Sequence, residues 1–122
     1  YLQEYGELIQ KRSDEWKEFA RKARLPYFPS VSPGWDATPR AAFNSSQLPR
    51  RYPWWPVVVG ENPPLFSDFL GRAIRFTKSH NITQLCFIAS WNEWSEGHYL
   101  EPDRRFGTAW LEAVRKEKKD DV

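Results

Sequence analysis

With 122 residues, the chain is long enough for one domain with a modest hydrophobic core. Its 18 basic and 16 acidic residues are too evenly balanced for the basic stripe that typifies nucleic-acid-binding proteins. No apolar run approaches the roughly 18 residues of a membrane span, and the single cysteine, Cys86, excludes an internal disulfide and is expected to be a small buried side chain. Seven tryptophans are many, and their rings either fill the core or stack on sugars.

The first predicted element is an amphipathic helix over residues 2–23, in which apolar side chains recur at three- and four-residue steps. Pro26 ends it. Residues 27–32 then form a short apolar strand, which Pro33 and Gly34 terminate. The predicted buried face of the helix consists of Tyr5, Leu8, Ile9, Trp16, Phe19, Ala20 and Ala23.

Residues 33–64 form a long, proline-rich connection. A loop of this length is usually functional or contains short elements of its own, and residues 57–60 are expected to be one such extended piece. Asn62 is expected to cap a helix that starts at the following prolines and ends near Ser79. Its predicted buried face consists of Phe66, Phe69, Leu70, Ala73, Ile74 and Thr77.

Residues 85–90 are continuously apolar, which is typical of a strand covered on both faces in a parallel sheet. A loop follows over residues 91–103. Asp103 is then expected to cap a last helix through about Lys116, with a solvated, frayed tail over residues 115–122.

Strands that alternate with helices imply parallel strands, and both long loops follow a strand. In a (β/α)8 barrel the active site lies on such loops, but two strands cannot close a barrel that typically needs about 250 residues. The sequence therefore predicts an α/β fold, the C-terminal portion of a (β/α)8 barrel, as a single partial domain over residues 1–122. The rest of the barrel is expected to be an N-terminal half outside this chain or a partner.

The strongest chemical signal is the segment 90–103, which places three glutamates and one aspartate within eleven residues, directly after the second predicted strand. Cleavage of a glycosidic bond generally needs two carboxyl groups. Glu93 leaves the strand and Glu96 follows three residues later, so one turn would bring both into one pocket, with Gly97 allowing the backbone to reverse. The alternative is a solvated acidic loop, or a loop whose Glu96 and Glu101 cap the following helix.

Asp36 and Arg40 form a second polar pair, which would either bind sugar hydroxyls and a phosphate or carboxylate group, or fix the loop as a structural ion pair. Trp35 and Trp94 are candidates for stacking on a sugar, with core packing as the alternative. His98 would line the pocket. A metal site needs clustered ligands, and His80 is expected on the opposite barrel face, so we predict no metal and no cofactor.

The segment from Trp91 to Asp103, together with Phe106-Gly107 and the earlier motifs 32–36 and 38–40, resembles the WbsX-like family over residues 27–114. Proteins of this family are often labelled glycosyltransferases of lipopolysaccharide or O-antigen assembly. They are related to glycoside hydrolase family 99, the endo-α-mannosidases. The resemblance implies a (β/α)8 barrel.

In the hydrolase branch the two glutamates of the Glu-Trp-x-Glu core are catalytic. The resemblance therefore implies that Glu93 removes a proton from the sugar 2-hydroxyl and that Glu96 is the acid/base at the glycosidic oxygen. It also implies retention through a 1,2-anhydro sugar. Ser95 stands where the mannosidases carry histidine, residues 98–100 stand where they carry Thr-Gln-Ile, and Ala37 stands where asparagine is expected. These departures favour the WbsX-like branch.

We therefore predict a carbohydrate-active enzyme, most simply a retaining hydrolase or transglycosylase on a polysaccharide or oligosaccharide. The alternatives are a glycosyltransferase that uses an activated sugar and a non-catalytic carbohydrate-binding barrel fragment. Localisation depends on this choice: cytoplasmic for a transferase, secretory or extracellular for a hydrolase. The predicted catalytic residues are Glu93 and Glu96, and the predicted substrate-binding residues are Trp35, Asp36, Arg40, Trp91, Asn92, Trp94, His98, Tyr99 and Glu101.

Overall fold

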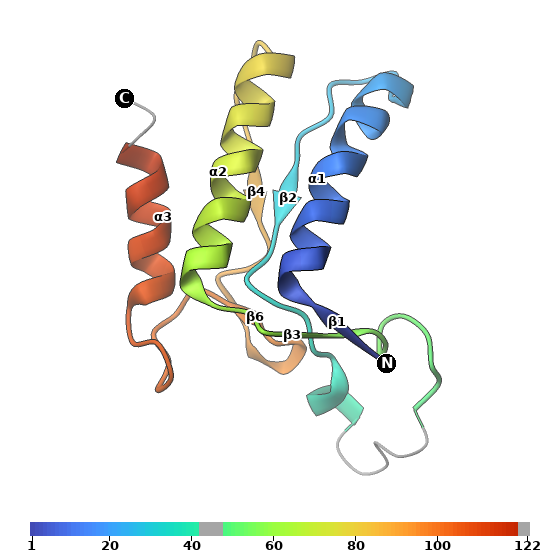
Figure 1. Ribbon diagram of the computed structural model, residues 1–122, viewed down its shortest axis with the longest axis vertical. Helices are drawn as coiled ribbons and strands as arrows, with labels where there is room; N and C mark the ends of the chain where they lie inside the picture. Colours follow the sequence, from blue (N-terminus) through green and yellow to red (C-terminus); the bar gives the residue numbers. More distant parts are fainter. Residues whose placement is uncertain (42–47, 120–122) are drawn as a thin grey trace.

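The computed structural model describes residues 1–41 and 48–119. Within this part of the chain, three helices lie side by side and short strands run behind two of them, which confirms the α/β class (Figure 1). The helices are α1 (Tyr5–Lys22), α2 (Pro63–His80) and α3 (Ala109–Lys119). None of them is long and apolar enough to cross a membrane.

The strands form two-stranded sheets. They are β1 (Leu2–Glu4), β2 (Ser30–Val31), β3 (Val57–Val59), β4 (Phe87–Ile88), β5 (Asn92–Glu93) and β6 (His98–Tyr99). β1 pairs in parallel with β3, and β2 in parallel with β4, whereas β5 and β6 are antiparallel. The described residues form no closed barrel. They do contain a parallel β2–α2–β4 unit, which is the repeating unit of such barrels.

The first helix begins at Tyr5, not at Leu2 as the periodicity predicts. Residues 2–4 are extended because their backbone pairs with β3, in the register Gln3 to Val58. The predicted buried face holds for Tyr5, Ile9 and Trp16, and the Trp16 ring stacks on Phe69 of α2 at 5.7 Å. Phe19 and Ala23, near the helix end, are exposed.

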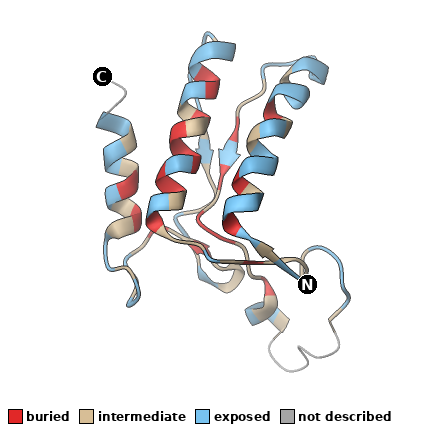
Figure 2. Cartoon of the chain, viewed as in Figure 1, coloured by how far each residue is buried: buried red, intermediate tan, exposed pale blue. Residues whose placement is uncertain are grey.

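The second helix follows the prediction closely. Asn62 accepts a hydrogen bond from the backbone N–H of Leu65 at 2.9 Å, and proline occupies the first turn. Figure 2 shows the buried stripe of α2 running along the helix, where it faces its neighbours. Every residue of the predicted buried face is buried except Ile74, which is half-buried.

Replacing Asn62 with alanine should lower the free energy of unfolding by about 0.5–2 kcal/mol, because the N–H of Leu65 loses its acceptor. Asn62→Ser should retain most of this stability, since a serine hydroxyl can also accept at the N-cap. Chemical denaturation of the three proteins measures the effect. Equal losses of unfolding free energy in both variants would show that the hydrogen bond to Leu65 does not stabilise the helix.

The strand predicted over residues 85–90 is shorter and more open than expected. Only Phe87 and Ile88 pair as a strand, with Ser30 and Val31. The prediction that both faces are covered is wrong for the described residues, because the Phe87 side chain is 56% exposed and Leu85 is similarly open. α1 and α2 cover the other face (Figure 1).

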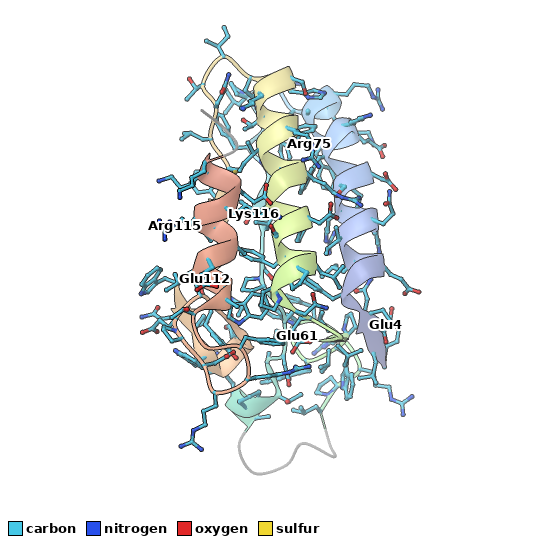
Figure 3. The ribbon with its side chains drawn as sticks, turned by 60° about the vertical axis from the view of Figure 1, so that its left-hand side comes forward. Glu4, Glu61, Arg75, Glu112, Arg115 and Lys116 are labelled. Atoms are coloured by element: carbon cyan, nitrogen blue, oxygen red, sulfur yellow. The ribbon has the colours of Figure 1, made fainter. Side chains whose placement is uncertain are left out.

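The last helix differs from the prediction at both ends. It begins at Ala109, so Asp103 is not its cap, and it continues to Lys119 instead of fraying from Arg115. Trp110 and Ala113 are buried against α2, and the Ser67 hydroxyl donates to the Glu117 carboxylate across the helix pair. This bond ties the charged end of α3 to α2. Arg115 and Lys116 still lie exposed on it (Figure 3), and the end of the predicted tail, residues 120–122, lies outside the described residues.

Candidate active site

The candidate site forms where the loops after β2 and β4 meet. The first loop contains the short 3-10 helix η1 (Thr38–Ala41), and the second contains β5, the 3-10 turn η3 (Trp94–Glu96) and β6. The backbone N–H of Asp36 donates to the carbonyl of Glu96 at 2.8 Å, which joins the two loops. This contact needs Gly97, whose φ is +67° and at which a Cβ would lie 2.9 Å from the Asp36 nitrogen.

Both predicted catalytic carboxylates bind one guanidinium. Arg40 Nη2 lies 2.7 Å from Glu93 Oε1, and Arg40 Nε lies 3.1 Å from Glu96 Oε1. Ser95 Oγ donates a further bond to Glu93 Oε1 at 2.9 Å. All three charged side chains remain partly exposed, so the two glutamates converge on a point that solvent reaches.

His98 is buried next to Glu96 and does not lie on the solvent-exposed side of the site. It is only 6% exposed, and its ring stacks on Trp35 at 5.3 Å with an interplanar angle of 13°. Its Nε2 lies 3.1 Å from Glu96 Oε2 and its Nδ1 lies 3.0 Å from Ser90 Oγ. Trp35 also stacks on Tyr52, so this predicted sugar-stacking ring already contacts two protein rings.

Asp36 and Arg40 do not pair with each other. Asp36 Oδ1 accepts from the backbone N–H of Thr38 at 3.0 Å and from its hydroxyl at 2.6 Å, which fixes the start of η1. Arg40, at the end of the same short helix, is thereby presented to Glu93 and Glu96. Of the two alternatives for this motif, the structural ion pair between Asp36 and Arg40 is not formed, because Arg40 binds the glutamates. Sugar binding by these two residues stays a prediction.

Trp94 and Tyr99 form an aromatic wall in the same loop as the glutamates. Trp94 stacks on Tyr99 with ring centroids 3.6 Å apart, and its Nε1–H donates to Glu101 Oε1 at 2.9 Å. Trp94 is nevertheless 45% exposed, and Trp91 is 56% exposed. Asn92 is also exposed on β5. These open rings keep Trp91 and Trp94 available for contact with a ligand.

Asp103 holds Tyr99 of this wall in place by a hydrogen bond, a role that the sequence does not reveal. It accepts hydrogen bonds from the Tyr99 hydroxyl at 2.8 Å, the Phe106 N–H at 2.6 Å and the Trp110 indole at 3.2 Å. Burial acts to raise the pKa of Asp103, but these donors outweigh it and hold the pKa below its usual value. Burial, together with the bond to Asp103, raises the pKa of Tyr99 to about 12.

Asp103→Asn should destabilise the protein by about 1–3 kcal/mol at neutral pH, because charge-assisted hydrogen bonds are lost. Since folding lowers the pKa of Asp103, its contribution is complete above the unfolded value near 3.9 and is lost as the pH falls through the lower folded value. The stability gap between wild type and variant should therefore close in acid. Asp14→Asn, at an exposed position of α1, is the control. A gap of constant size from pH 7 to pH 2 would contradict this account.

A small cavity adjoins the site on the far side of Gly97. It measures about 160 Å³, and Trp35, Asp36 and Tyr99 contribute to its lining. Glu61 and Arg105 also line it, 3.7 Å apart as an ion pair, and no sequence pattern singles out either residue. Figure 3 shows Glu61 just ahead of α2, at the end of the helices where the two loops meet.

Comparison with known proteins gives one family and two relatives. Both relatives are described as "Uncharacterized protein WxcX", from two strains of Xanthomonas campestris pv. campestris, and each is 33% identical over 110 residues. The match covers 84% of this chain but only 14% of each relative. No solved structure is significantly similar. The family model described as "Glycosyltransferase WbsX" matches residues 2–114, which contain both loops of the site, and the chain therefore belongs to the WbsX glycosyltransferase family.

Proposed function

We propose that this chain carries the catalytic carboxylates of an enzyme that acts on the glycosidic bonds of a polysaccharide or oligosaccharide. The observation that carries the proposal is the clamp in which Arg40 binds both Glu93 and Glu96. Two carboxyl groups directed at one point are what glycosidic chemistry needs. The family name suggests a carbohydrate-active role for the chain, and the exposed ring of Trp94, the residue after Glu93, offers a stacking surface.

Glu96 is the proposed acid/base, and Glu93 the proposed base toward the 2-hydroxyl. In the first step Glu93 takes the 2-hydroxyl proton, O2 bonds to C1, and the bond from C1 to the leaving oxygen breaks as that oxygen takes a proton from Glu96. In the second step the acceptor oxygen bonds to C1 and gives its proton to Glu96, while O2 leaves C1 and recovers its proton from Glu93. The configuration at C1 is retained. This scheme rests on the resemblance to the family 99 hydrolases.

The identity of the acceptor distinguishes the possible enzymes. Water makes the protein a hydrolase, and a sugar hydroxyl makes it a transglycosylase. The family description favours a third form, a transferase in polysaccharide synthesis that takes its sugar from an activated donor. The Arg40 clamp is compatible with that form too, since a guanidinium also binds phosphate well.

We also propose that the β2–α2–β4 unit is one part of a larger (β/α)8 barrel, to which residues 1–122 contribute a partial domain. The half-exposed apolar side chains of Leu85 and Phe87 support this, because a barrel strand is covered on both faces. The chain spans only about one seventh of the length of its two relatives, which leaves ample sequence for the remaining strands in proteins of that size.

The test uses the protein that carries this chain, incubated with a panel of oligosaccharides, with and without sugar acceptors and activated sugar donors, in water enriched in ¹⁸O. Mass spectrometry of the products shows both reaction and acceptor. We expect new products that the Glu93→Gln/Glu96→Gln double variant does not form. A label at the new reducing end identifies hydrolysis, and its absence in an elongated product identifies transfer. Binding of glycans with no product in any arm would leave a non-catalytic carbohydrate-binding role and overturn the proposal.

A further inference from the structure

One guanidinium contacts both proposed catalytic carboxylates. Arg40 Nη2 donates to Oε1 of Glu93 at 2.7 Å, and Arg40 Nε lies 3.1 Å from Oε1 of Glu96 as an ion pair. The guanidinium is planar and rigid, and its N–H groups project in fixed directions. Because two atoms of this one rigid group each contact an oxygen of a different glutamate, Arg40 restrains the position of one carboxylate relative to the other.

Arg40 also offsets the repulsion between the two negative charges. Glu93 and Glu96 are three positions apart across the single turn η3, and like charges that contact the same group repel each other at close range. The shared cation comes from the other loop, at the end of η1. Asp36 Oδ1 fixes the start of η1 by accepting from the N–H of Thr38. The N–H of Asp36 donates to the carbonyl of Glu96 at 2.8 Å, so the same short segment that carries Arg40 is tied to the loop of the glutamates.

The contacts of Glu93 leave one of its two oxygens open. Oε1 accepts from Arg40 and, at 2.9 Å, from the hydroxyl of Ser95. No hydrogen bond within residues 1–41 and 48–119 reaches Oε2. The Glu93 side chain is 40% exposed, so a ligand can approach it. An anchored Oε1 beside an open Oε2 suits a base that takes a proton from a substrate, because the first oxygen fixes where the second one points.

We infer that Arg40 is a positioning residue, which holds Oε1 of both glutamates and directs Oε2 of Glu93 at the sugar 2-hydroxyl. The inference rests on the proposed function, in which Glu93 takes the 2-hydroxyl proton as O2 bonds to C1. Arg40 gives up no proton itself, since a guanidinium stays protonated in proteins. It acts through the glutamates and not on the sugar. A substrate-binding role for Arg40 would instead act on the affinity for the glycan, so the two roles change different kinetic constants.

The first test is Arg40→Lys in the protein that carries this chain. Lysine keeps the positive charge, but its compact ammonium group lacks the planar fork that contacts both glutamates. We expect kcat on a natural substrate to fall by about 10²-fold, because a displacement of about 1 Å of a catalytic group can reduce the rate by that factor. KM should change little. Steady-state kinetics measure both constants, and circular dichroism checks that the variant is folded.

Arg115→Lys is the matched control, because Arg115 is an exposed arginine of α3 outside the candidate site, and this variant should match the wild type. A raised KM with unchanged kcat in Arg40→Lys would assign Arg40 to substrate binding and overturn the inference. Wild-type kinetics in Arg40→Lys would overturn it too, because a single charge would then be sufficient.

The second test does not need activity. Nitrogen-15 NMR of the arginine side chains, with Arg40 assigned from the Arg40→Lys variant, reports rotation of the guanidinium, which a hydrogen-bonded carboxylate slows. We expect slow rotation of Arg40 in the wild type and in Glu101→Ala, whose carboxylate contacts Trp94, but faster rotation in Glu93→Ala. A guanidinium that rotates freely in the wild type, or that does not respond to Glu93→Ala, would overturn the inference. If no glycan reacts but Arg40 responds as expected, the proposed function fails and the link between Arg40 and Glu93 stands.

Discussion

Replacing Glu96 with glutamine is expected to cut the rate on a natural substrate by about 10²- to 10⁴-fold, which is the usual contribution of general acid catalysis. The structure supports this role because Glu96 contacts both Arg40 and His98, and both contacts hold its carboxylate in place. The loss should be much smaller on an activated aryl glycoside, whose leaving group departs without a proton. Steady-state kinetics on one natural and one activated substrate measure the contrast.

Glu93→Gln should behave differently, although Glu93 binds the same guanidinium. As the base toward the 2-hydroxyl, it does not act on the leaving group, so both substrates should lose rate alike. A 2-deoxy substrate should not react even with the wild-type protein. If both variants lose activity equally on both substrates and both melt at lower temperature, the residues only shape the loop. Rapid turnover of the 2-deoxy substrate would leave the ordinary two-carboxylate mechanism instead.

Gly97→Ala is the second substitution with a large expected effect. A Cβ at this position would lie 2.9 Å from the Asp36 nitrogen, in the backbone contact that joins the two loops. The backbone must therefore shift, in addition to the roughly 1–2 kcal/mol that a left-handed φ costs an L-residue. Glu96 directly precedes this glycine, so a backbone shift would move its carboxylate. We expect at least about a 10²-fold loss of activity, because a displacement of about 1 Å of a catalytic group can reduce the rate by that factor.

Gly107→Ala is the matched control. Gly107 has a similar φ of +58°, but a Cβ there meets nothing within 4 Å. This variant should lose only about 1–2 kcal/mol of stability and retain its activity. Denaturation and activity measurements on both variants distinguish the cost of a positive φ, which both share, from the cost of the close contact with Asp36, which only Gly97→Ala has. Equal activities in the two variants would show that the close approach at Gly97 does not position Glu96.

The sequence predicts best those features that depend on local patterns. The Asn62 cap, the apolar stripe of α2 and the alternation of helices with parallel strands all follow from spacing and turn chemistry. The convergence of Glu93 and Glu96 is also local, since they are three positions apart and one 3-10 turn brings them together.

Features that depend on distant partners escape this reasoning. Residues 2–4 continue the helical periodicity, but their backbone pairs with residues 57–59, which no local pattern reveals. Arg40 binds the glutamates instead of Asp36 because the first loop folds back over the second, an outcome that neither motif specifies alone. Likewise, His98 appears in the sequence as one polar residue in an acidic loop, and only the structure places its ring between Trp35, Ser90 and Glu96.

The central claim is that Glu93 and Glu96 act together on one glycosidic bond. The most direct measurement is kcat/KM of Glu93→Gln, Glu96→Gln and the double variant on one natural substrate, with folding checked by circular dichroism. Residues that act as a unit show strongly non-additive losses. We predict that the double variant loses about as much activity as the more damaged single variant. A double loss equal to the product of the two single losses would contradict the claim, because it would mean that the two carboxylates contribute independently.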